Sequence, residues 1–346
     1  MLIPERDGYP ASADQIFLTA GASQGVSYLL QTLLAAPNDG ILIPIPQYPL
    51  YTASLSLLKG NAIPYYLSEE TGWSLHVPDL RQALSKARSE GIRPRALVVI
   101  NPGNPTGGCL TEDVITDVIR LCEEENLVLI GDEVYQTNVY LDNRPFHSFK
   151  KLVCKLDSPI ELVSLHSVSK GMIGECGHRG GYFELHNFDP EVQQQIYKLA
   201  SINLCPPITG QIVVDLMVNP PTESSPSYKH FKEEFTSIFN GLKSRALSLK
   251  EAFEKMQGVQ CQSPEGAMYL FPRLVDIPEK AVEAAKKEGK LVDEYYCKRM
   301  LEAAGICVIP GSGFGQKDGT WHYRTTFLAS MDYHVADRYF QTSGSY

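Results

Sequence analysis

The chain has 346 residues, which at about 150 residues per domain predicts roughly two domains. Its hydrophobic content of 43% and charged content of 21% are typical of a soluble globular protein and exclude disordered, collagen-like and coiled-coil classes. The formal net charge of -9 argues against nucleic acid and membrane surfaces as partners, because both are negatively charged.

The eight cysteines lack CxxC or zinc-site spacing, which favours reduced, mostly buried thiols in an intracellular protein without a metal site. No run approaches the roughly 18 apolar residues of a membrane helix, and the first residues resemble neither a signal peptide nor a transit leader. We therefore expect a cytoplasmic protein, with mitochondria as the alternative compartment.

The first half of the chain alternates short apolar strands with amphipathic helices. Strands are predicted at 16–20, 41–45, 96–100, 127–131 and 161–165. One helix is expected directly after 21–23, and another starts at Thr111, a suitable N-cap residue. Such near-continuous apolar strands are typical of a parallel sheet covered by helices on both faces, so the pattern predicts an α/β fold.

The pattern changes after the Pro- and Ser-rich segment 219–228. A long helix is predicted over 231–256, followed by a strand at 267–271, a charged helix over 280–304 and a final strand at 321–329. The long helix should present one apolar face, formed by Phe231, Phe235, Ile238, Leu242, Leu249 and Phe253. We divide the chain into a large domain over 1–218 and an interdomain helix with a small domain over 219–346.

Lys170 lies in the segment SVSK, just after the strand predicted at 161–165. Open α/β sheets bind their ligands at this carboxyl edge. An uncharged lysine amine there can bond covalently to a carbonyl compound. For an isolated lysine, however, a solvated surface position is the more frequent explanation.

Two more segments follow strands at the same expected edge. In DEVY, Asp132 can pair with a cation, although capping a helix is the commoner role for a lone aspartate, and Tyr135 can direct its phenol to the same site. The loop 101–108, NPGNPTGG, has the composition of a rigid turn with two amide side chains free to bond a ligand.

The turn Gly21-Ala22-Ser23 joins a strand to a helix. Small residues at a helix N-terminus allow backbone N–H groups to approach a phosphate, although an ordinary tight turn explains them equally well. The sequence matches neither GxGxxG nor a P-loop, so a dinucleotide or P-loop site is not supported.

In this chain order, the four features resemble the fold type I pyridoxal 5'-phosphate (PLP) enzymes, and specifically the class I and II aminotransferases. The motifs NPGNPTG, DEVY and SVSKG recur at the family's relative spacings, while GASQGV, PIPQYPLY, LHSVSKGMIGECGHRGGYFEL and NLCPP look like the alanine aminotransferase branch. The resemblance covers 6–329. It implies the PLP-dependent transferase fold type I, with a mostly parallel central sheet, a smaller α+β C-terminal domain and a homodimer.

The resemblance also implies roles for individual residues. Lys170 matches the catalytic lysine that holds PLP and moves the substrate proton. Asp132 matches the partner of the ring nitrogen, where an anion keeps a proton on the ring. Tyr135 and Asn104 match the groups that contact the ring's 3'-oxygen, and Tyr48 matches the aromatic residue that stacks on the ring.

The two anion sites are assigned in the same way. Ala22, Ser23, Ser167 and Arg179 match the site for the PLP phosphate, where arginine can make two parallel hydrogen bonds. Arg324 matches the arginine that binds the α-carboxylate of the substrate, beside Asn104. We interpret His166, His178 and Cys176 as structural residues.

The resemblance implies transamination between an amino acid and a 2-oxo acid, specifically L-alanine and 2-oxoglutarate giving pyruvate and L-glutamate by a ping-pong mechanism. The chain departs from the family in lacking a further N-terminal region, which includes a tyrosine that reaches the partner's cofactor phosphate, and in the residues 331–346. The alternatives are a truncated, weak or inert PLP-fold chain acting as an interaction protein, and another fold type I enzyme.

Overall fold

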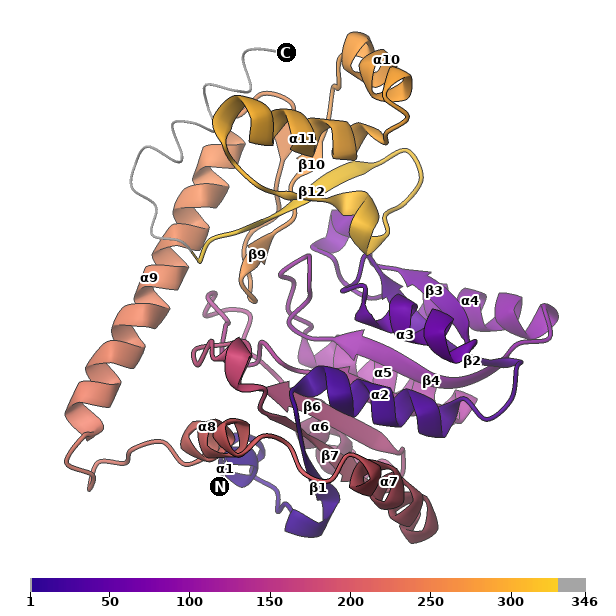
Figure 1. Cartoon of the computed structure of the whole chain (residues 1–346). Helices are drawn as coiled ribbons and strands as arrows, with labels where there is room; N and C mark the ends of the chain where they lie inside the picture. The colour runs from indigo at the N-terminus through magenta and orange to yellow at the C-terminus, as the bar shows by residue number, and fades with distance from the viewer. Residues whose placement is uncertain (1, 329–346) are drawn as a thin grey trace.

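A computed structural model describes residues 2–328 and contains a central seven-stranded sheet in the order β1-β7-β6-β5-β4-β2-β3 (Figure 1). The strands are β1 (Ile16–Thr19), β2 (Asp39–Ile45), β3 (Asn61–Tyr66), β4 (Arg93–Ile100), β5 (Val128–Asp132), β6 (Leu162–Ser167) and β7 (Gly181–His186). Strands β3, β2, β4, β5 and β6 are parallel, whereas β7 runs antiparallel to both β6 and β1. The prediction of a mostly parallel sheet is confirmed.

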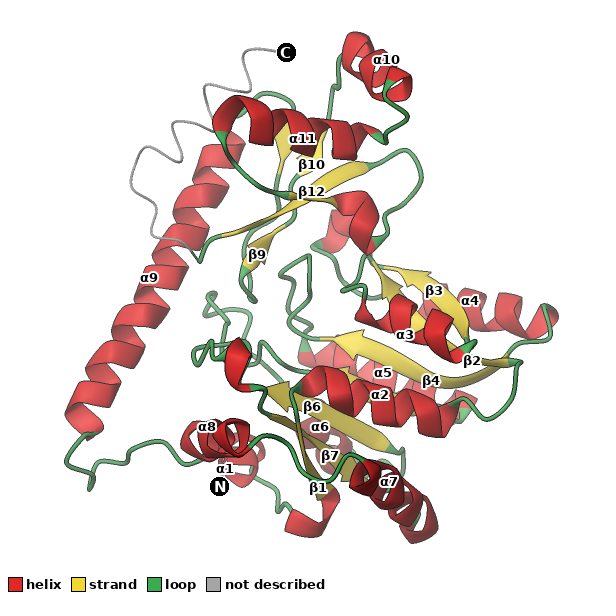
Figure 2. Cartoon of the chain, viewed as in Figure 1, coloured by secondary structure: helices red, strands yellow, loops and turns green. Residues whose placement is uncertain are grey.

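Helices cover both faces of this sheet (Figure 2). One face packs against α2 (Ala22–Leu33), α3 (Leu50–Leu58) and α7 (Pro190–Ile202), and the other against α4 (Val77–Ser89), α5 (Glu112–Glu125) and α6 (Phe149–Lys155). In β4, Ala96 and Val98 enter the first core, while Leu97 and Val99 enter the second. Both sides of the strand are apolar because both are buried, as the continuous runs predicted.

Two shorter helices lie beside the sheet, and one predicted cap is confirmed. α1 (Leu2–Asp7) and α8 (Ile208–Val218) contribute Ile3 and Val214 to a small cluster with Tyr182 of β7. Thr111 caps α5, because its hydroxyl accepts a hydrogen bond of 3.4 Å from the Val114 amide.

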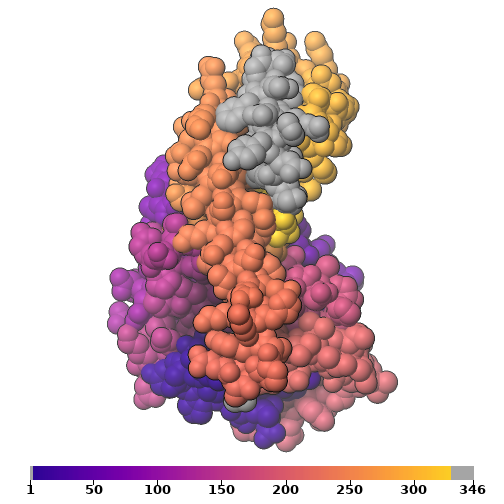
Figure 3. All heavy atoms as spheres, turned by 90° about the vertical axis from the view of Figure 1, so that its left-hand side faces the viewer, coloured from indigo at the N-terminus to yellow at the C-terminus, as the bar shows by residue number. Residues whose placement is uncertain are grey.

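The second unit contains an antiparallel sheet in the order β11-β12-β10-β8, with β9 paired to β12. Its strands are β8 (Val259–Gln260), β9 (Tyr269–Leu270), β10 (Arg273–Leu274), β11 (Ile309–Pro310) and β12 (Trp321–Thr326), and its helices are α9 (Tyr228–Glu254), α10 (Glu279–Lys287) and α11 (Val292–Ala304). In Figure 3, α9 (orange) faces the viewer and runs along the outside of the molecule from the large unit to the second unit. The division of the chain at 218/219 stays a prediction.

The helix predicted over 280–304 is interrupted, because Gly289 adopts a left-handed φ of 65° between α10 and α11. The strand predicted at 267–271 is only the two residues of β9. The apolar face of α9 is buried at Leu242, Leu249 and Phe253 but exposed at Phe235 (37%) and Ile238 (49%), because only its C-terminal half joins the core of the second unit. The expectation for residues 331–346 lies outside the described residues.

No helix within residues 2–328 is long and apolar enough to cross a membrane. In the same part of the chain, no group of three or more His, Cys, Asp or Glu side chains is arranged to hold a metal ion. The eight cysteines are all free thiols, and burial raises the pKa of Cys109, Cys261 and Cys297 to about 12 in each case.

Candidate active site

The segments predicted to carry chemistry meet at one edge of the central sheet. Strands β4, β5 and β6 are parallel neighbours, so the segments that follow them, with Asn104, Asp132 and Lys170, lie at the same carboxyl edge. Strand β1 reaches this edge as well, because the antiparallel β7 between β1 and β6 leaves β1 pointing in the same direction as β6.

Asp132 is a buried carboxylate with one oxygen bound and one free. Its Oδ2 accepts a hydrogen bond of 2.8 Å from the hydroxyl of Tyr51, and its Oδ1 has no hydrogen-bond partner among the described residues. Burial raises the pKa of Asp132, while the bonds from Tyr51 and the Val134 amide and the charge of Lys170 oppose that shift. An unpaired buried carboxylate oxygen indicates a place for a cationic group.

Lys170 lies in the turn after β6 and is half-buried. Its amine makes no hydrogen bond or ion pair with another residue of the described chain, yet it is near enough to act electrostatically on Asp132. The next residue, Gly171, has φ 67°, and a Cβ there would come 2.8 Å from Oγ1 of Thr137. The turn that presents Lys170 therefore requires glycine.

Arg179 lies across the N-terminus of α2. Its Nη2 donates to the carbonyl of Ala20 (2.8 Å) and to Oγ of Ser23 (3.5 Å), and its Nη1 donates to Oγ of Ser169 (3.3 Å). Within the described residues, no carboxylate pairs with this guanidinium. A helix N-terminus beginning at Ala22, together with an arginine that binds only neutral oxygens, forms an anion site.

The hydroxyls of Ser167 and Ser169 have different hydrogen-bond partners, which the sequence did not predict. The buried Ser167 hydroxyl donates to the Gly180 carbonyl (3.1 Å) and accepts from the Ser169 amide (3.1 Å). Of these two hydroxyls, only that of Ser169 contacts Arg179 within the described residues. The alternating letters of SVSK allow either serine to face the anion site, so no signal in the sequence separates them.

Arg324 of β12 meets the large unit at Asn104. Its Nη1 donates to Oδ1 of Asn104 (3.0 Å), and its guanidinium lies 4.2 Å from the ring centre of Tyr269 and 4.6 Å from that of Phe314. Two aromatic rings and an amide oxygen therefore hold the guanidinium in place. Arg324 has no carboxylate partner in the part of the chain that the structure describes.

Tyr135 connects this arginine group to the Asp132 side of the edge. Asn104 Nδ2 donates to its hydroxyl (3.4 Å), and that hydroxyl donates to the hydroxyl of Tyr269 (3.2 Å). Burial, followed by the neighbouring Tyr269, raises the pKa of Tyr135 well above its usual value. Tyr135 therefore remains a neutral donor at physiological pH.

The remaining predicted residues lie apart from these contacts. Tyr48, after β2, is 44% exposed. His166 is buried against Tyr182, and burial lowers its pKa to about 3, so the imidazole is neutral. His178 lies at the surface 3.5 Å from Glu175, and Cys176 is exposed. These positions support a structural interpretation of both histidines.

Sequence reasoning missed four residues of the site, namely Tyr51, Ser169, Tyr269 and Phe314. For Tyr51 the sequence offered one signal, namely a second tyrosine three residues after Tyr48 in QYPLY. The structure shows that this second tyrosine is the fully buried one. Tyr269 and Phe314 belong to a different unit from the motifs, and nothing in the sequence connects them with Asn104.

The residues present fit the PLP that the motifs imply. The unpaired Oδ1 of Asp132 suits a protonated ring nitrogen, and the amine of Lys170 suits the aldehyde. The anion site of Arg179 suits the phosphate, and Gly21 is required there because a Cβ would come 2.5 Å from Nη2 of Arg179.

Comparisons with known proteins concern the chain as a whole. The sequence pattern of aminotransferase class I and II matches residues 6–341. Alanine aminotransferase 2 of Panicum miliaceum is 53% identical over 95% of this chain, and the mitochondrial alanine aminotransferase 2 of Arabidopsis thaliana is 52% identical over the same share. The chain spans 69% and 62% of the lengths of these two relatives.

Other relatives in this range of similarity have different names. Glutamate–glyoxylate aminotransferase 1 of Arabidopsis thaliana is 51% identical over 95% of this chain and 69% of its own length. An inactive alanine aminotransferase of Saccharomyces cerevisiae is 47% identical over 94% of this chain and 66% of its own length.

A solved structure of an alanine aminotransferase from Pyrococcus furiosus superposes with a TM-score of 0.84 at 25% identity, covering 99% of this chain and 79% of that one. The fold is therefore that of the fold type I aminotransferases. With the family pattern matched along nearly the whole chain, this protein belongs to the class I and II aminotransferases, which depend on PLP.

Proposed function

We propose that the chain catalyses transamination between L-alanine and 2-oxoglutarate, giving pyruvate and L-glutamate. The observation that carries this proposal is the guanidinium of Arg324, which has no carboxylate partner among the described residues. It is held by Asn104 at the sheet edge that also bears Lys170 and Asp132. A planar guanidinium suits the α-carboxylate shared by all four reactants. The names of the relatives support alanine as the amino donor.

Several residues would hold the cofactor. Bound PLP supplies an electron-accepting ring that makes the α-hydrogen of an amino acid acidic. Asp132, supported by Tyr51, would keep a proton on the ring nitrogen. Tyr135 and Asn104 would contact the 3'-oxygen, and Tyr48 would stack on the ring. The phosphate would be bound by Ala22, Ser23, Ser167, Ser169 and Arg179.

The chain's own residues divide the remaining work. Arg324 and Asn104 would bind the α-carboxylate and so fix the direction of the Cα–H bond. Lys170 Nζ would take the proton from Cα of the amino acid and pass it to the bound cofactor within the same half-reaction. In the other half-reaction Nζ would move a proton in the opposite direction, from the cofactor to Cα of the carbon skeleton supplied by the 2-oxo acid. Tyr135 and Tyr269, hydrogen-bonded to each other beside Asn104 and Arg324, would exclude water from the carboxylate site.

The test compares Lys170→Ala with Lys198→Ala, a matched loss of an exposed lysine on α7. Each PLP-loaded chain is assayed for pyruvate formation and for the visible absorbance change on adding L-alanine. We expect wild type and Lys198→Ala to respond and Lys170→Ala to lose turnover. A folded, PLP-loaded wild-type chain with no response would refute the proposal and favour an inert interaction protein.

Glyoxylate is the second candidate acceptor, because one similar relative is a glutamate–glyoxylate aminotransferase. Assaying pyruvate release from L-alanine with 2-oxoglutarate and with glyoxylate, at matched concentrations, ranks the two. A higher kcat/KM with glyoxylate would show that glyoxylate, and not 2-oxoglutarate, is the preferred acceptor. The proposed reaction class, transamination, would be unchanged.

We propose that the chain acts as a homodimer. Large apolar side chains are exposed from the end of α7 through α8, namely Ile202 (75%), Leu204 (88%), Ile208 (70%), Ile212 (55%) and Leu216 (60%). Several large exposed apolar side chains within one short stretch of chain are typical of an interface. Sedimentation of wild type and Leu204→Asp tests this, because the substitution should convert a dimer into monomer.

We also propose a cytoplasmic location, with mitochondria as the alternative that cell fractionation would distinguish.

A further inference from the structure

The loop over 68–74, which follows β3, lies between the two units of the molecule. Ser68 and Ser74 pair as an isolated bridge, and the 3-10 turn Glu69–Thr71 lies between them. Trp73 has φ 65°, a left-handed conformation that non-glycine residues seldom adopt, and is only 7% exposed. Such a conformation persists only where surrounding contacts enforce it.

Glu69 contacts the second unit through its carboxylate. Its Oε2 lies 3.2 Å from Nε2 of His322 and 3.3 Å from Nη1 of Arg273. These two residues are cross-strand partners on β12 and β10. The ring of Trp73 meets the same place edge-on, with centroid distances of 5.5 Å to His322 and 5.7 Å to Phe271.

These contacts continue to Arg324. His322 and Arg324 are two residues apart on β12 and therefore point to the same side of the strand. His322 is stacked on Phe271 at 4.8 Å, and Phe271 meets Phe314 edge-on at 6.0 Å. Phe314 in turn lies against the guanidinium of Arg324 at 4.6 Å.

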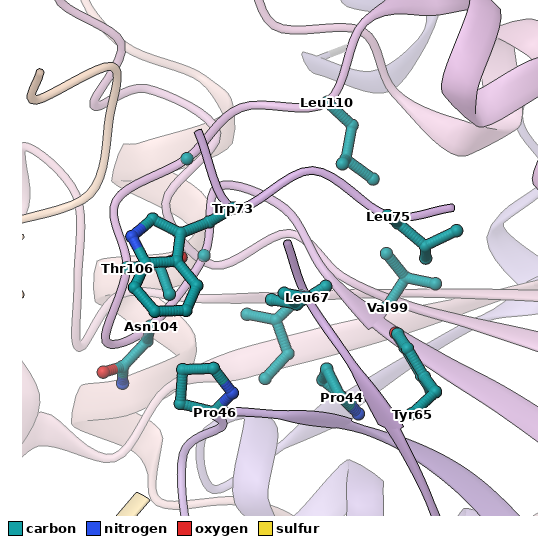
Figure 4. A pocket seen from close by; sticks show the side chains of 13 residues that line it. Pro44, Pro46, Tyr65, Leu67, Trp73, Leu75, Val99, Asn104, Thr106 and Leu110 are labelled. Atoms are coloured by element: carbon teal, nitrogen blue, oxygen red, sulfur yellow. The ribbon is translucent and has the colours of Figure 1, made fainter. Parts of the chain in front are cut away.

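The loop also contacts the segment that carries Asn104. A Cβ at Gly108 would come 2.9 Å from the carbonyl oxygen of Gly72 and 3.6 Å from Cβ of Trp73, so the two loops are in direct contact. Trp73, Asn104, Thr106 and Gly108 line one pocket (Figure 4). The loop therefore contacts the neighbours of both partners of the 3.0 Å bond between Arg324 and Asn104, namely His322 and Phe271 on the side of Arg324 and Gly108 on the side of Asn104.

We propose that Glu69 and Trp73 are positioning residues for the carboxylate site, holding Arg324 of one unit in register with Asn104 of the other. The proposal rests on the proposed function only in identifying the bound carboxylate as that of the substrate. Neither residue touches the reacting atoms. Their loss should weaken binding of every reactant that uses the shared α-carboxylate, because one clamp serves both half-reactions.

The test uses the full, PLP-loaded chain with Glu69→Gln and Arg273→Gln, singly and combined. Glu70→Gln is the matched control, since it removes the same charge from the exposed neighbouring residue. Steady-state kinetics give kcat and the KM of L-alanine and of 2-oxoglutarate. Calorimetry gives the Kd of propionate, a carboxylate without an amino or oxo group that depends on no catalytic step.

We expect Glu69→Gln to raise both KM values and the propionate Kd about fivefold, which is ~1 kcal/mol, with kcat within about twofold of wild type. Arg273→Gln should do the same, and the double variant should lose less than the product of the two single effects because the residues share one contact. Glu70→Gln should match wild type.

The outcomes separate this inference from the proposed function. If wild type turns over but Glu69→Gln leaves both KM values unchanged, changes only one of them, or behaves like Glu70→Gln, positioning by this loop is refuted. If wild type shows no turnover, weakened propionate binding in Glu69→Gln still supports the inference. Absence of propionate binding to wild type would overturn it together with the carboxylate site.

Discussion

The hydrogen bond from Tyr51 to Asp132 leads to a sharp prediction. Tyr51→Phe removes a single oxygen from a side chain that is fully buried, so the aromatic packing of α3 against the sheet is retained. Asp132 then keeps its burial, which raises its pKa, but loses the strongest interaction that opposes the rise. The carboxylate becomes easier to protonate and less able to hold a proton on the ring nitrogen of bound PLP.

The size of the effect follows from the kind of bond that is lost. A hydrogen bond to a charged group contributes ~1.5–3 kcal/mol, more than one between neutral groups. Each 1.36 kcal/mol corresponds to about a tenfold change in rate, so kcat/KM should fall by roughly tenfold to a hundredfold. Because the pKa of Asp132 rises further, the acid limb of the kcat/KM profile should move to higher pH, and raising the pH should recover part of the loss.

The chain offers a matched control in Tyr65. This residue is also buried, and its hydroxyl donates a bond of the same length, 2.8 Å, but to the carbonyl of Val98. Tyr65→Phe should also lower the unfolding midpoint in urea, through the loss of a buried hydrogen bond between neutral groups, but should leave the pH profile in place. If the two variants have the same pH profile and the same kcat/KM, the reasoning about Asp132 is wrong.

Two further predictions concern the anion site and the buried carboxyl group of Glu133. Gly21→Ala places a Cβ 2.5 Å from Nη2 of Arg179, whereas Gly91→Ala has a similar φ (78° against 86°) and an open surrounding. Both should lose about 1 kcal/mol of stability, but only Gly21→Ala should raise the Kd of PLP, by about tenfold or more in a fluorescence titration, and equal Kd values would contradict the anion-site assignment. Burial raises the pKa of Glu133 to about 7, so its contribution is fully present below the unfolded pKa near 4.5 and is lost as pH rises through 7. Urea unfolding should therefore show wild type losing about 3 kcal/mol relative to Glu133→Gln between pH 4.5 and pH 8, and a pH-independent difference would exclude this origin.

The strand ends could be predicted because their signal is local. Asn104, Asp132 and Lys170 follow apolar runs that are continuous enough to identify buried parallel strands, and parallel strands bring their carboxyl ends to one edge. The order of the strands was not needed to expect these side chains together. The motif spacing then assigned the residues to a family that the comparisons confirm.

Strands β3 and β7 were missed because each contains a residue that is unusual in a strand. In β3, Pro64 interrupts an alternating pattern, which an edge strand tolerates because one side needs no ladder hydrogen bonds. In β7, Glu184 is a charged residue in the middle of a buried strand. It is buried because Lys150 of α6 pairs with it, and the sequence does not show that contact.

The site residues that were missed depend on how the two units meet. Tyr269 comes from a strand of two residues, and Phe314 from a short 3-10 turn (Gly311–Phe314), so neither has a periodic pattern. Their contacts with Arg324 exist only because the second unit lies against the loop that carries Asn104. No local rule predicts a contact across so long a separation in sequence.

The bond between Arg179 and the carbonyl of Ala20 joins residues 159 positions apart. On a ribosome, the turn at Gly21 would emerge early and could not bind a phosphate until β7 and Arg179 had been synthesised and folded beside it. The carboxylate clamp would have to wait for Arg324, near the end of the described chain. Binding of the cofactor phosphate therefore requires a folded central sheet. Binding of the substrate carboxylate also requires that the second unit has packed against that sheet.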